Sequence, residues 1–514
     1  MKRGPAIVLA LVMSPLLALA APPTLESVFP PGGRQGSEVD LTLLGKFEPW
    51  PCAVWFSEKG FAFTPDPEKP GTGKLKIDPS APVGPVLLRV HNAEGASAPA
   101  IFVVGTQTEL VDEDKDGNTL GGAAPLDRTK LPCVVNGTFS ASGELDAWRI
   151  ALEKGETLHA RVEAYGLRSL VDPALHLYDA QGNRLALVHD GAANLDPTLV
   201  FAAPEAGDYL LALVGFSHPP SVNVAYVGSK NIHYRLHLAL KPEDIPARLR
   251  PADPGSDSAA PALTPGTPLA ATLKEPGVAN RHPVTAKKGD KLLVRVEGRT
   301  LGFPIDPVLR LLKPDGSEIR REDDTGGSPD PEYLWTVAED GEYGIEVADR
   351  YGRGGGGMRY RLSAAPPQPD FRLTADKNTY PMERGKALEI KITLTRLHGH
   401  EGELALSAEG LPGTIFLVAP DKVPEKNGDF VLKLDAKPDA PAFDGPIRLV
   451  AKEAKEGGTL ARTVVFSFKD DNYRGPYAID EFPDLWLTLP PMPPAKEEEG
   501  AKAEEKKDGA EKKD

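Results

Sequence analysis

Cysteine, aromatic residues and long apolar runs are all scarce in this sequence of 514 residues. There are two cysteines, and aromatic residues make up 7% of the chain. Two cysteines are too few for a disulfide-stapled scaffold or for a structural zinc site, which takes four ligands. Beyond residue 20, no run reaches the roughly 18 apolar residues that a membrane-spanning helix requires. We therefore expect no transmembrane segment.

Positive charge is also in short supply, because 59 Lys and Arg face 74 Asp and Glu, a net charge of −15. Such an excess repels phosphate backbones, so nucleic acid is not an expected partner. Glycine (51) and proline (52) are plentiful instead. That composition is typical of a turn-rich β protein, and the length predicts roughly three to five domains.

The first twenty residues have the pattern of a signal peptide. Lys2 and Arg3 precede an apolar run over residues 6–19, and residues 18–20 offer small side chains for cleavage. Residues 1–20 are thus expected to direct export to the periplasm, the cell surface or the medium. In an oxidising compartment Cys52 and Cys133 could form one disulfide, and the alternative is two buried free thiols.

Short alternating apolar and polar runs between glycines predict a β-sandwich in the first part of the chain. Residues 39–43 and 86–90 are such runs. Pro30, spaced glycines and a strand that ends at Gly45 resemble the opening of immunoglobulin-like IPT/TIG domains. The resemblance implies an immunoglobulin-like fold over residues 21–105.

An internal repeat with a constant offset of 134 residues follows. The landmarks of the first copy are Gly155, Asp172-Pro173, Gly182, Asp196-Pro197, Gly207 and Tyr209, and those of the second are Gly289, Asp306-Pro307, Gly316, Asp330-Pro331, Gly341 and Tyr343. The runs between them are short and of β type, so each copy is expected to be an antiparallel β unit. Gly182 and Gly316 fall where a hairpin turn needs positive φ.

The two copies resemble the bacterial pre-peptidase C-terminal (PPC) domain. The matching segments are residues 143–148, 170–175, 206–209 and 234–236 in the first copy and 305–311, 340–343 and 360–362 in the second. The resemblance implies jelly-roll-like sandwiches that accompany secreted enzymes, some members being associated with calcium or with polymers such as collagen. Here the upstream segment is too short for a protease domain.

The expected architecture is all-β, with tandem β-sandwich domains. After the signal peptide and the first immunoglobulin-like domain come a first repeat at 106–242, a linker at 243–268, a second repeat at 269–365, an immunoglobulin-like domain at 370–470, and an extension at 471–514 with a charged tail. The linker is rich in Pro, Ala, Ser and Asp, and the tail lacks large apolar side chains.

The interval from Tyr209 to Tyr234 in the first copy is eight residues longer than the interval from Tyr343 to Tyr360 in the second. The extra residues lie between Phe216 and Asn231. Phe216, Tyr226 and two prolines make this insert a candidate contact loop. The alternative is a hairpin packed against the neighbouring domain.

Signatures of common enzymes are missing from the sequence. There is no nucleophile elbow, zinc-protease helix or phosphate loop. His398 and His400 form the closest histidine pair, and a solvent-facing turn is the expected setting. The four Asp-Pro pairs are expected to cap backbone N–H groups, and Trp148 and Trp335 to pack in cores. His233 and His237 are expected to cover a sheet.

One calcium site is expected, in the first repeat. Asp112, Asp114 and Asp116 alternate, but Ala123 takes the place of the glutamate that closes an EF-hand loop. In calcium-associated members of the resembled family, an acidic linker meets a loop that here holds Glu144 and Asp146. The second copy has Val278 and Asn280 at the loop positions, so it is expected to be empty, and a solvated acidic loop is the alternative for the first copy.

The pattern favours an exported, non-catalytic, multidomain β protein that binds or adheres at the cell surface or envelope. A polysaccharide, a protein polymer or an envelope protein would be its partner, and calcium is the one cofactor expected. Two alternatives remain open, a structural spacer or accessory subunit of a secreted enzyme and an unrecognised hydrolase.

Overall fold

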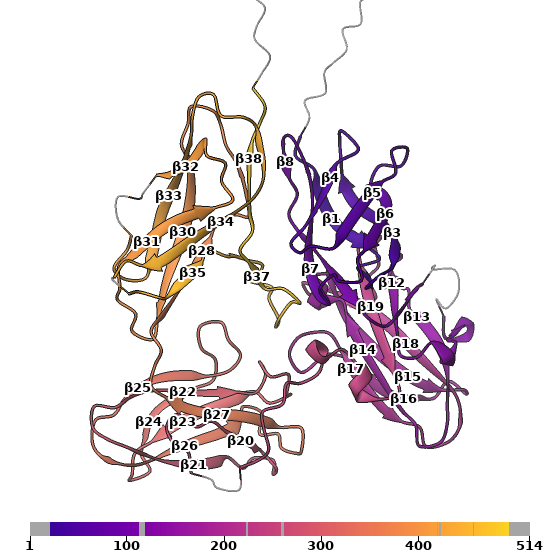
Figure 1. Cartoon of the computed structure of the whole chain (residues 1–514). Helices are drawn as coiled ribbons and strands as arrows, with labels where there is room; N and C mark the ends of the chain where they lie inside the picture. Colours follow the sequence, from indigo (N-terminus) through magenta and orange to yellow (C-terminus); the bar gives the residue numbers. More distant parts are fainter. Residues whose placement is uncertain are drawn as a thin grey trace, which may run out of the picture.

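The computed structural model describes residues 21–112, 119–222, 225–258, 262–418, 420, 423–455 and 457–492. The expected signal peptide lies outside these residues. Four β-rich bodies follow one another along the chain and are arranged in a ring (Figure 1). Within the described residues the helices are short 3-10 turns, and none is long and apolar enough to cross a bilayer. These turns are η1 (Leu120–Gly122), η2 (Arg128–Lys130), η3 (Tyr165–Leu167), η4 (Pro242–Asp244) and η5 (Ala247–Leu249).

The first body is a sandwich of two sheets. One sheet has the order β1 (Thr24–Phe29), β3 (Glu38–Lys46), β6 (Thr72–Ile77), β5 (Phe61–Pro65). The other has the order β2 (Gly32–Arg34), β9 (Ala100–Gly105), β7 (Gly84–Asn92), β4 (Ala53–Phe56), and β8 (Gly95–Ala96) pairs with β7. Leu41 and Leu43 are buried between the sheets, as the alternation in β3 predicts.

The second body, the first repeat, has two five-stranded sheets. The first has the order β10 (Thr108–Val111), β12 (Cys133–Thr138), β19 (His233–Ala239), β14 (Thr157–Glu163), β17 (Thr198–Ala202). The second has the order β11 (Ala124–Pro125), β13 (Asp146–Leu152), β18 (Gly207–Ser217), β15 (Val171–Asp179), β16 (Arg184–Val188). Trp148 lies in the core between them, as expected.

The third body, the second repeat, has the same strand order without the two edge strands β10 and β11. Its sheets are β20 (Leu269–Thr272), β27 (Arg359–Ala365), β22 (Lys291–Glu297), β25 (Glu332–Thr336), and β21 (Asn280–Ala286), β26 (Gly341–Asp349), β23 (Pro307–Leu312), β24 (Glu318–Glu322). Trp335 is in its core. Gly182 and Gly316 have φ values of 85° and 86° at equivalent turns. The repeat seen in the sequence is therefore a repeat of structure.

The fourth body extends further than the sequence predicts. Its sheets are β28 (Asp370–Ala375), β30 (Leu388–Leu397), β33 (Gly428–Ala436), β32 (Ile415–Val418), and β29 (Thr379–Pro381), β38 (Leu485–Leu489), β34 (Phe443–Glu453), β31 (Leu404–Glu409), with β35 (Ala461–Thr463) on β34. The boundary expected at residue 470 is wrong, because β38 is buried between β29 and β34. The chain leaves the sandwich between these strands, and β36 (Phe466–Ser467) pairs with β37 (Glu481–Phe482) outside it.

The expected linker is also more than a spacer. Ile245 is buried, and Leu263 belongs to the core of the second repeat. The 3-10 turn η4 spans the start of this segment, and η5 lies within it. Composition alone predicts a free linker at 243–268. A few buried apolar residues among many prolines are enough to pack both ends of this segment against the neighbouring domains.

Buried contacts close the ring between the fourth and first bodies. Arg89, which is fully buried in β7, donates a hydrogen bond of 2.9 Å to Oδ1 of Asn378. Its guanidinium lies 5.5 Å from the ring centre of Phe482. The rings of Trp55 and Trp486 meet edge to face at 5.7 Å. Such desolvated aromatic and arginine contacts hold the two sandwiches together.

The excursion between β36 and β37 fastens the fourth body to the first repeat. The N–H of Ala478 donates to the carbonyl of Gly166 at 2.7 Å, and the N–H of Arg474 donates to the hydroxyl of Tyr165 at 2.6 Å. The rings of Tyr165 and Tyr477 lie 5.0 Å apart. Residues distant in the sequence thus meet at the centre of the ring.

Candidate functional site

The structure brings three residues of the expected calcium site around one tyrosine. The hydroxyl of Tyr234 donates to Oδ2 of Asp146 at 2.6 Å. Burial raises the pKa of Tyr234 well above its ordinary value, and the charges of Asp146, Asp112 and Glu144 add to the rise. These carboxylates therefore lie near the same buried hydroxyl. Asp114 and Asp116 lie outside the described residues.

The second repeat is different at the equivalent place. Asn280, which stands where the first repeat has Asp146, donates to the hydroxyl of Tyr360 at 2.9 Å. Asp257, in the expected linker ahead of this copy, contributes to the raised pKa of Tyr360, after burial. A single carboxylate and an amide carry less negative charge than the set in the first repeat.

The Asp-Pro pairs behave in two ways. Asp196 accepts hydrogen bonds from the N–H groups of residues 164–166, and Asp330 does so from those of residues 298–300, as the capping hypothesis predicts. Asp172 does not cap a turn, because it lies within β15 and its Oδ1 is buried without a hydrogen-bond donor. That part of the prediction is wrong.

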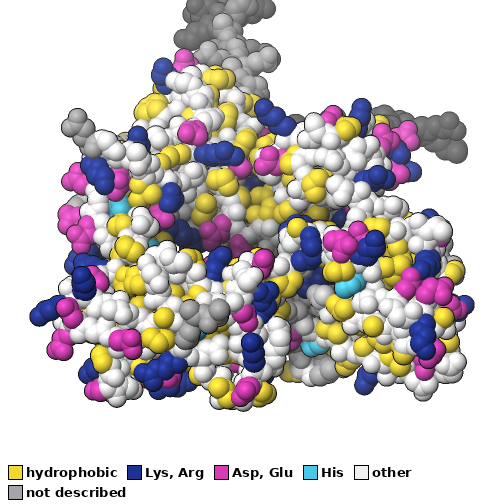
Figure 2. Space-filling view, turned by 60° about the horizontal axis from the view of Figure 1, so that its bottom comes forward, with side chains coloured by type: hydrophobic (Ala, Val, Ile, Leu, Met, Phe, Trp, Pro, Cys, Tyr) yellow, Lys and Arg dark blue, Asp and Glu magenta, His cyan; other side chains and the backbone are white. Residues whose placement is uncertain are grey.

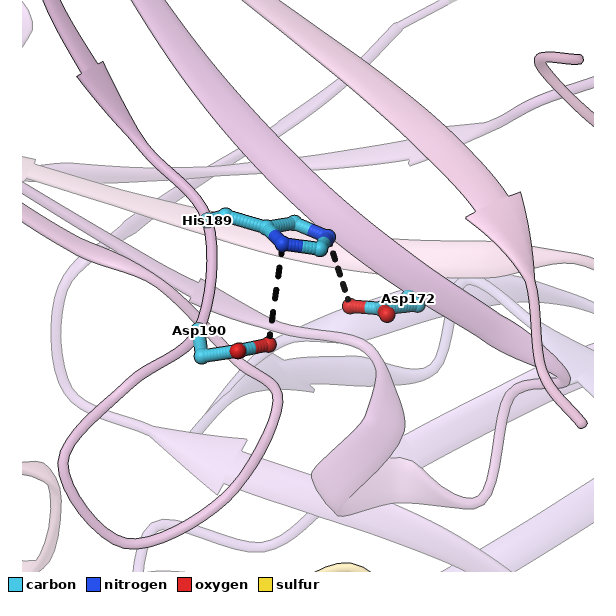
Figure 3. A group of neighbouring side chains, drawn as sticks. All are labelled: Asp172, His189 and Asp190. Carbon is cyan, nitrogen blue, oxygen red and sulfur yellow. Dashed lines mark ion pairs between the residues drawn. The ribbon is translucent and has the colours of Figure 1, made fainter. Parts of the chain in front are cut away.

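Asp172 instead belongs to a cluster with His189 and Asp190 (Figure 3). Nε2 of His189 lies 3.2 Å from Oδ1 of Asp172, and its Nδ1 lies 3.9 Å from Oδ1 of Asp190. Burial and the charge of Asp190 raise the pKa of Asp172 to about 6, although His189 opposes the rise. Among the described residues, this is the one group of three whose ligand atoms all lie within 4.8 Å of one another. Nothing in the sequence spacing placed these residues together.

Of the histidines singled out in the sequence, His233, His237 and His400 are buried and His398 is half-buried. His400 is 4% exposed and Nε2 of His398 lies 3.1 Å from Oε1 of Glu332 in the second repeat, so the solvent-facing turn is wrong. His233 and His237 do cover a sheet. His233 faces the first sandwich, where its Nε2 lies 3.1 Å from Oγ of Ser27.

His237 belongs to a buried charged cluster that sequence reasoning missed. Its Nε2 lies 2.7 Å from Oε2 of Glu163, and Nη2 of Arg248 donates to the same oxygen at 2.8 Å. Burial would raise the pKa of Glu163, but Arg248 and His237 outweigh it and hold that pKa well below its usual range. Arg235 packs beside them and also against the backbone of Gly32 in the first sandwich. A Cβ at Gly32 would lie 1.7 Å from Nη1 of Arg235. Only glycine fits there.

The two cysteines are free and buried, and they belong to separate hydrophobic cores. Sγ of Cys52 lies 3.3 Å from the carbonyl oxygen of Pro49 in the first sandwich. Burial raises the pKa of Cys133 to about 11 in the first repeat. The structure therefore has the alternative of two buried thiols rather than the disulfide.

The insert of the first repeat packs on its own domain. The rings of Phe216 and Tyr226 meet at 5.3 Å, and the carbonyl of Tyr226 accepts a hydrogen bond from the N–H of Gly143. His218 reaches the fourth body, with its Nε2 3.0 Å from the carbonyl oxygen of Asn472. This arrangement agrees with the packed hairpin and not with a loop of free aromatic side chains.

A cavity of about 750 Å³ lies where the first repeat, the former linker, the second repeat and the excursion of the fourth body meet. Figure 2 shows the molecule hollowed near its centre, with apolar and charged side chains mixed in the walls. The size falls in the range of roughly 300–1,000 Å³ that is typical of ligand pockets. Three of its walls come from different bodies, so the cavity exists because the ring is closed.

The chemistry of the cavity is that of a site for a polar ligand without a large charge. Arg161, Arg248 and Arg250 line it together with Glu163, Asp190 and Asp196. Nη1 of Arg161 is held by the carbonyl of Asp196 at 2.9 Å. Val200, 60% exposed, and Tyr477 supply apolar surface. Balanced charges with donors, acceptors and apolar walls suit a ligand that carries many hydroxyl groups.

No family model matches this chain, and no curated protein matches it. Among solved structures, it is similar to the pre-peptidase C-terminal domain of collagenase from Bacillus anthracis, with 14% identity, 21% of this chain and 97% of that chain covered, and a TM-score of 0.17. It is also similar to the S-layer protein rSbsC, with 8% identity, 91% of this chain and 54% of that chain covered, and a TM-score of 0.15.

A third similar structure is a DUF4785 family protein from Legionella pneumophila, with 11% identity, 64% of this chain and 89% of that chain covered, and a TM-score of 0.11. This chain spans about half the length of the S-layer protein that it matches. The TM-scores are too low to support an inference about function.

Proposed function

We propose that this chain is an exported, non-catalytic β protein that binds an extracellular polymer, with a polysaccharide as the favoured class. One observation carries the proposal: the cavity of about 750 Å³ is assembled from several bodies at the centre of a closed ring. A site formed in this way is pre-organised by the domain contacts around it, which lowers the cost of binding. Hydroxyl-rich chains match its mixture of donors, acceptors and apolar walls.

Export and family are parts of the same proposal. Residues 1–20 act as the signal peptide, so mass spectrometry of exported protein should find a chain that begins at Ala21. The two repeats are PPC-like modules, which their common strand order supports. Calcium binds beside Asp112, Glu144 and Asp146 in the first repeat, where carboxylates gather around Tyr234.

Binding can be tested with one substitution and a matched control. Val200 in β17 faces the cavity, and Leu334, 39% exposed, is its equivalent in the second repeat and is not among the cavity-lining residues. The mature protein is screened on an array of polysaccharides and matrix polymers. Val200→Arg should weaken binding of the best ligand by about tenfold or more, and Leu334→Arg should leave it unchanged. No binding on the array, or equal loss in both variants, would contradict the proposal.

The closed ring favours a second candidate, a rigid spacer or accessory subunit. Buried contacts such as those of Arg89 with the fourth body would keep the shape fixed without any ligand. This function requires the ring and not the cavity. If the protein binds nothing on the array, and no longer binds its partner enzyme once the ring is opened, it would be a spacer.

A further inference from the structure

The cluster of Asp172, His189 and Asp190 has a composition that the proposed polymer site does not explain. Asp172 projects from β15, while His189 and Asp190 follow the end of β16, so two neighbouring strands bring the three side chains together (Figure 3). The side chain of Asp172 is 17% exposed, and those of His189 and Asp190 are 46% and 59% exposed. One side of the cluster is therefore embedded in the sandwich and the other is open to solvent.

Asp172 is incompletely satisfied in this position. Its Oδ1 is buried and accepts no hydrogen bond, and Nε2 of His189 lies 3.2 Å from it. A buried carboxylate oxygen without a donor costs free energy unless a cation or a proton compensates it. The ring of Phe216 packs edge to face with the imidazole of His189, with the ring centres 5.6 Å apart. An aromatic ring supplies no hydrogen bond and no full charge.

The second repeat shows how the same position is neutralised elsewhere. At the offset of 134 residues, Asp306, Asp323 and Asp324 stand where the first repeat has Asp172, His189 and Asp190. There Arg350 pairs with Asp323 at 2.8 Å. Arg350 is the equivalent of Phe216. The second repeat thus carries its own cation, and the first repeat has exchanged the acid–arginine pair for a histidine and a phenylalanine.

We propose that Asp172, His189 and Asp190 bind one divalent transition-metal ion, of which Zn²⁺ is the representative. An imidazole nitrogen with two carboxylate oxygens is a donor set that zinc and related ions accept, whereas calcium and magnesium prefer oxygen alone. The site is therefore distinct in chemistry from the expected calcium site near Tyr234. Three protein ligands leave at least one position of the ion for water or for an oxygen of a ligand.

The place of the cluster gives the ion a role beside the cavity. Asp190 also lines the cavity, and the loop that runs from it to Asp196 forms one wall. An ion held by β15 and by the start of this loop would fix the wall at one end, while the capping bonds of Asp196 fix the other. This role rests on the proposed polymer function, but binding of the ion does not.

Metal binding is measured directly on the untagged mature chain. Isothermal titration with Zn²⁺ should find one tight site, and Co²⁺ should give the visible absorption of nitrogen and oxygen coordination. His189→Gln and Asp172→Asn should each lower the affinity by about tenfold or more, since even outer-shell changes cost that much at metal sites. His159→Gln, another histidine of the same repeat, and Asp306→Asn in the second repeat are the matched controls and should bind as the wild type does.

A measurement on the wild type guards against variants that fold poorly. Zn²⁺ should protect His189 from acylation by diethyl pyrocarbonate, read by peptide mass mapping, while the half-buried His159 stays as reactive as before. Unchanged zinc affinity in His189→Gln, or unchanged reactivity of His189 with zinc present, would overturn the metal site. Zinc binding without polymer binding would retain this site and contradict only the proposed function.

Discussion

Asp196 and Asp330, which stand 134 residues apart, each accept hydrogen bonds from three backbone N–H groups at equivalent positions of the two repeats. Each carboxylate lies within 3.0 Å of the three nitrogens that follow the strand equivalent to β14. Tyr209 and Tyr343 repeat the pattern, because each hydroxyl donates to the carbonyl four residues earlier. These four landmarks of the repeat are thus residues whose hydrogen bonds connect loops to the sheets.

Removing either carboxylate should destabilise its own repeat. Asp196→Ala or Asp330→Ala leaves three N–H groups without their acceptor, in a loop that is buried in the first repeat and partly exposed in the second. The expected cost is about 3 kcal/mol for Asp196→Ala, and less for Asp330→Ala. The exposed Asp208 provides the control, and Asp208→Ala should change stability by less than about 0.5 kcal/mol. Urea unfolding followed by circular dichroism and by hydrogen exchange of each repeat measures the effect. A cost below that of the control would show that the caps are dispensable.

What the sequence could predict was local or repeated. The alternation around Leu41, the turns at Gly182 and Gly316, and the core positions of Trp148 and Trp335 follow from side-chain period and turn chemistry, and the structure confirms them. The offset of 134 residues added long-range information, because two copies of one fold constrain each other. It predicted two antiparallel β units, and the strands that the two copies share do pair antiparallel, whereas the edge strands β10 and β11 of the first copy pair parallel.

What the sequence could not predict depends on contacts between distant segments. Arg248 lies in a proline-rich stretch that looks like a linker, yet it pairs with Glu163. β38 follows a polar excursion, so its return to the fourth sandwich left no periodic signal. His189 meets Asp172 only because β15 and β16 pair in one register. Charge pairing of this kind is set by tertiary packing and is not visible in composition.

The junction of the first two bodies should weaken in acid through His233. Burial lowers the pKa of His233 to about 4, while Thr138 and Ser27 contact its two ring nitrogens. Since the folded pKa lies below the unfolded value of about 6.5, the stabilisation is complete above that value and is lost as the pH falls toward 4. The loss from this group between pH 7.5 and pH 5 is about 2 kcal/mol.

His233→Gln keeps polar contacts but removes the titration. Its unfolding midpoint in urea should change less between pH 7.5 and pH 5 than that of the wild type, and the two curves should approach each other in acid. Parallel pH profiles for variant and wild type would show that His233 does not carry this dependence.

Arg89 should hold the ring closed. Arg89→Ala removes its hydrogen bonds to Asn378 and to the carbonyl of Asp484 and its contact with Phe482, so the first and fourth bodies should separate. Small-angle X-ray scattering should then give a larger radius of gyration than for the wild type. Arg149→Ala, at an exposed position of β13, should leave the scattering unchanged. A compact Arg89→Ala protein would mean that the other junction contacts suffice.

Calcium should stabilise the first repeat and not the second. The carboxylates of Asp112, Glu144 and Asp146 gather near Tyr234, whereas the second repeat offers Asn280 and the single acid Asp257 near Tyr360. An ion that binds only the folded state, at about a hundred times its dissociation constant, adds roughly 2.7 kcal/mol. Because oxygen ligands near one another repel until a divalent cation joins them, chelator should lower the melting temperature of the first repeat within the full chain.

The matched pair for this test is Asp112→Asn in the first repeat and Asp257→Asn ahead of the second. Asp112→Asn should abolish most of the calcium-dependent rise in melting temperature, since it removes one negative ligand and leaves the buried bond between Tyr234 and Asp146 intact. Asp257→Asn should melt with the same calcium dependence as the wild type, because the second repeat lacks the charge to hold the ion. Zinc in place of calcium should raise the melting temperature of Asp112→Asn as much as that of the wild type, because its proposed ligands Asp172, His189 and Asp190 are unchanged in the variant. Equal melting temperatures of the wild type in millimolar calcium and in chelator would rule the calcium site out.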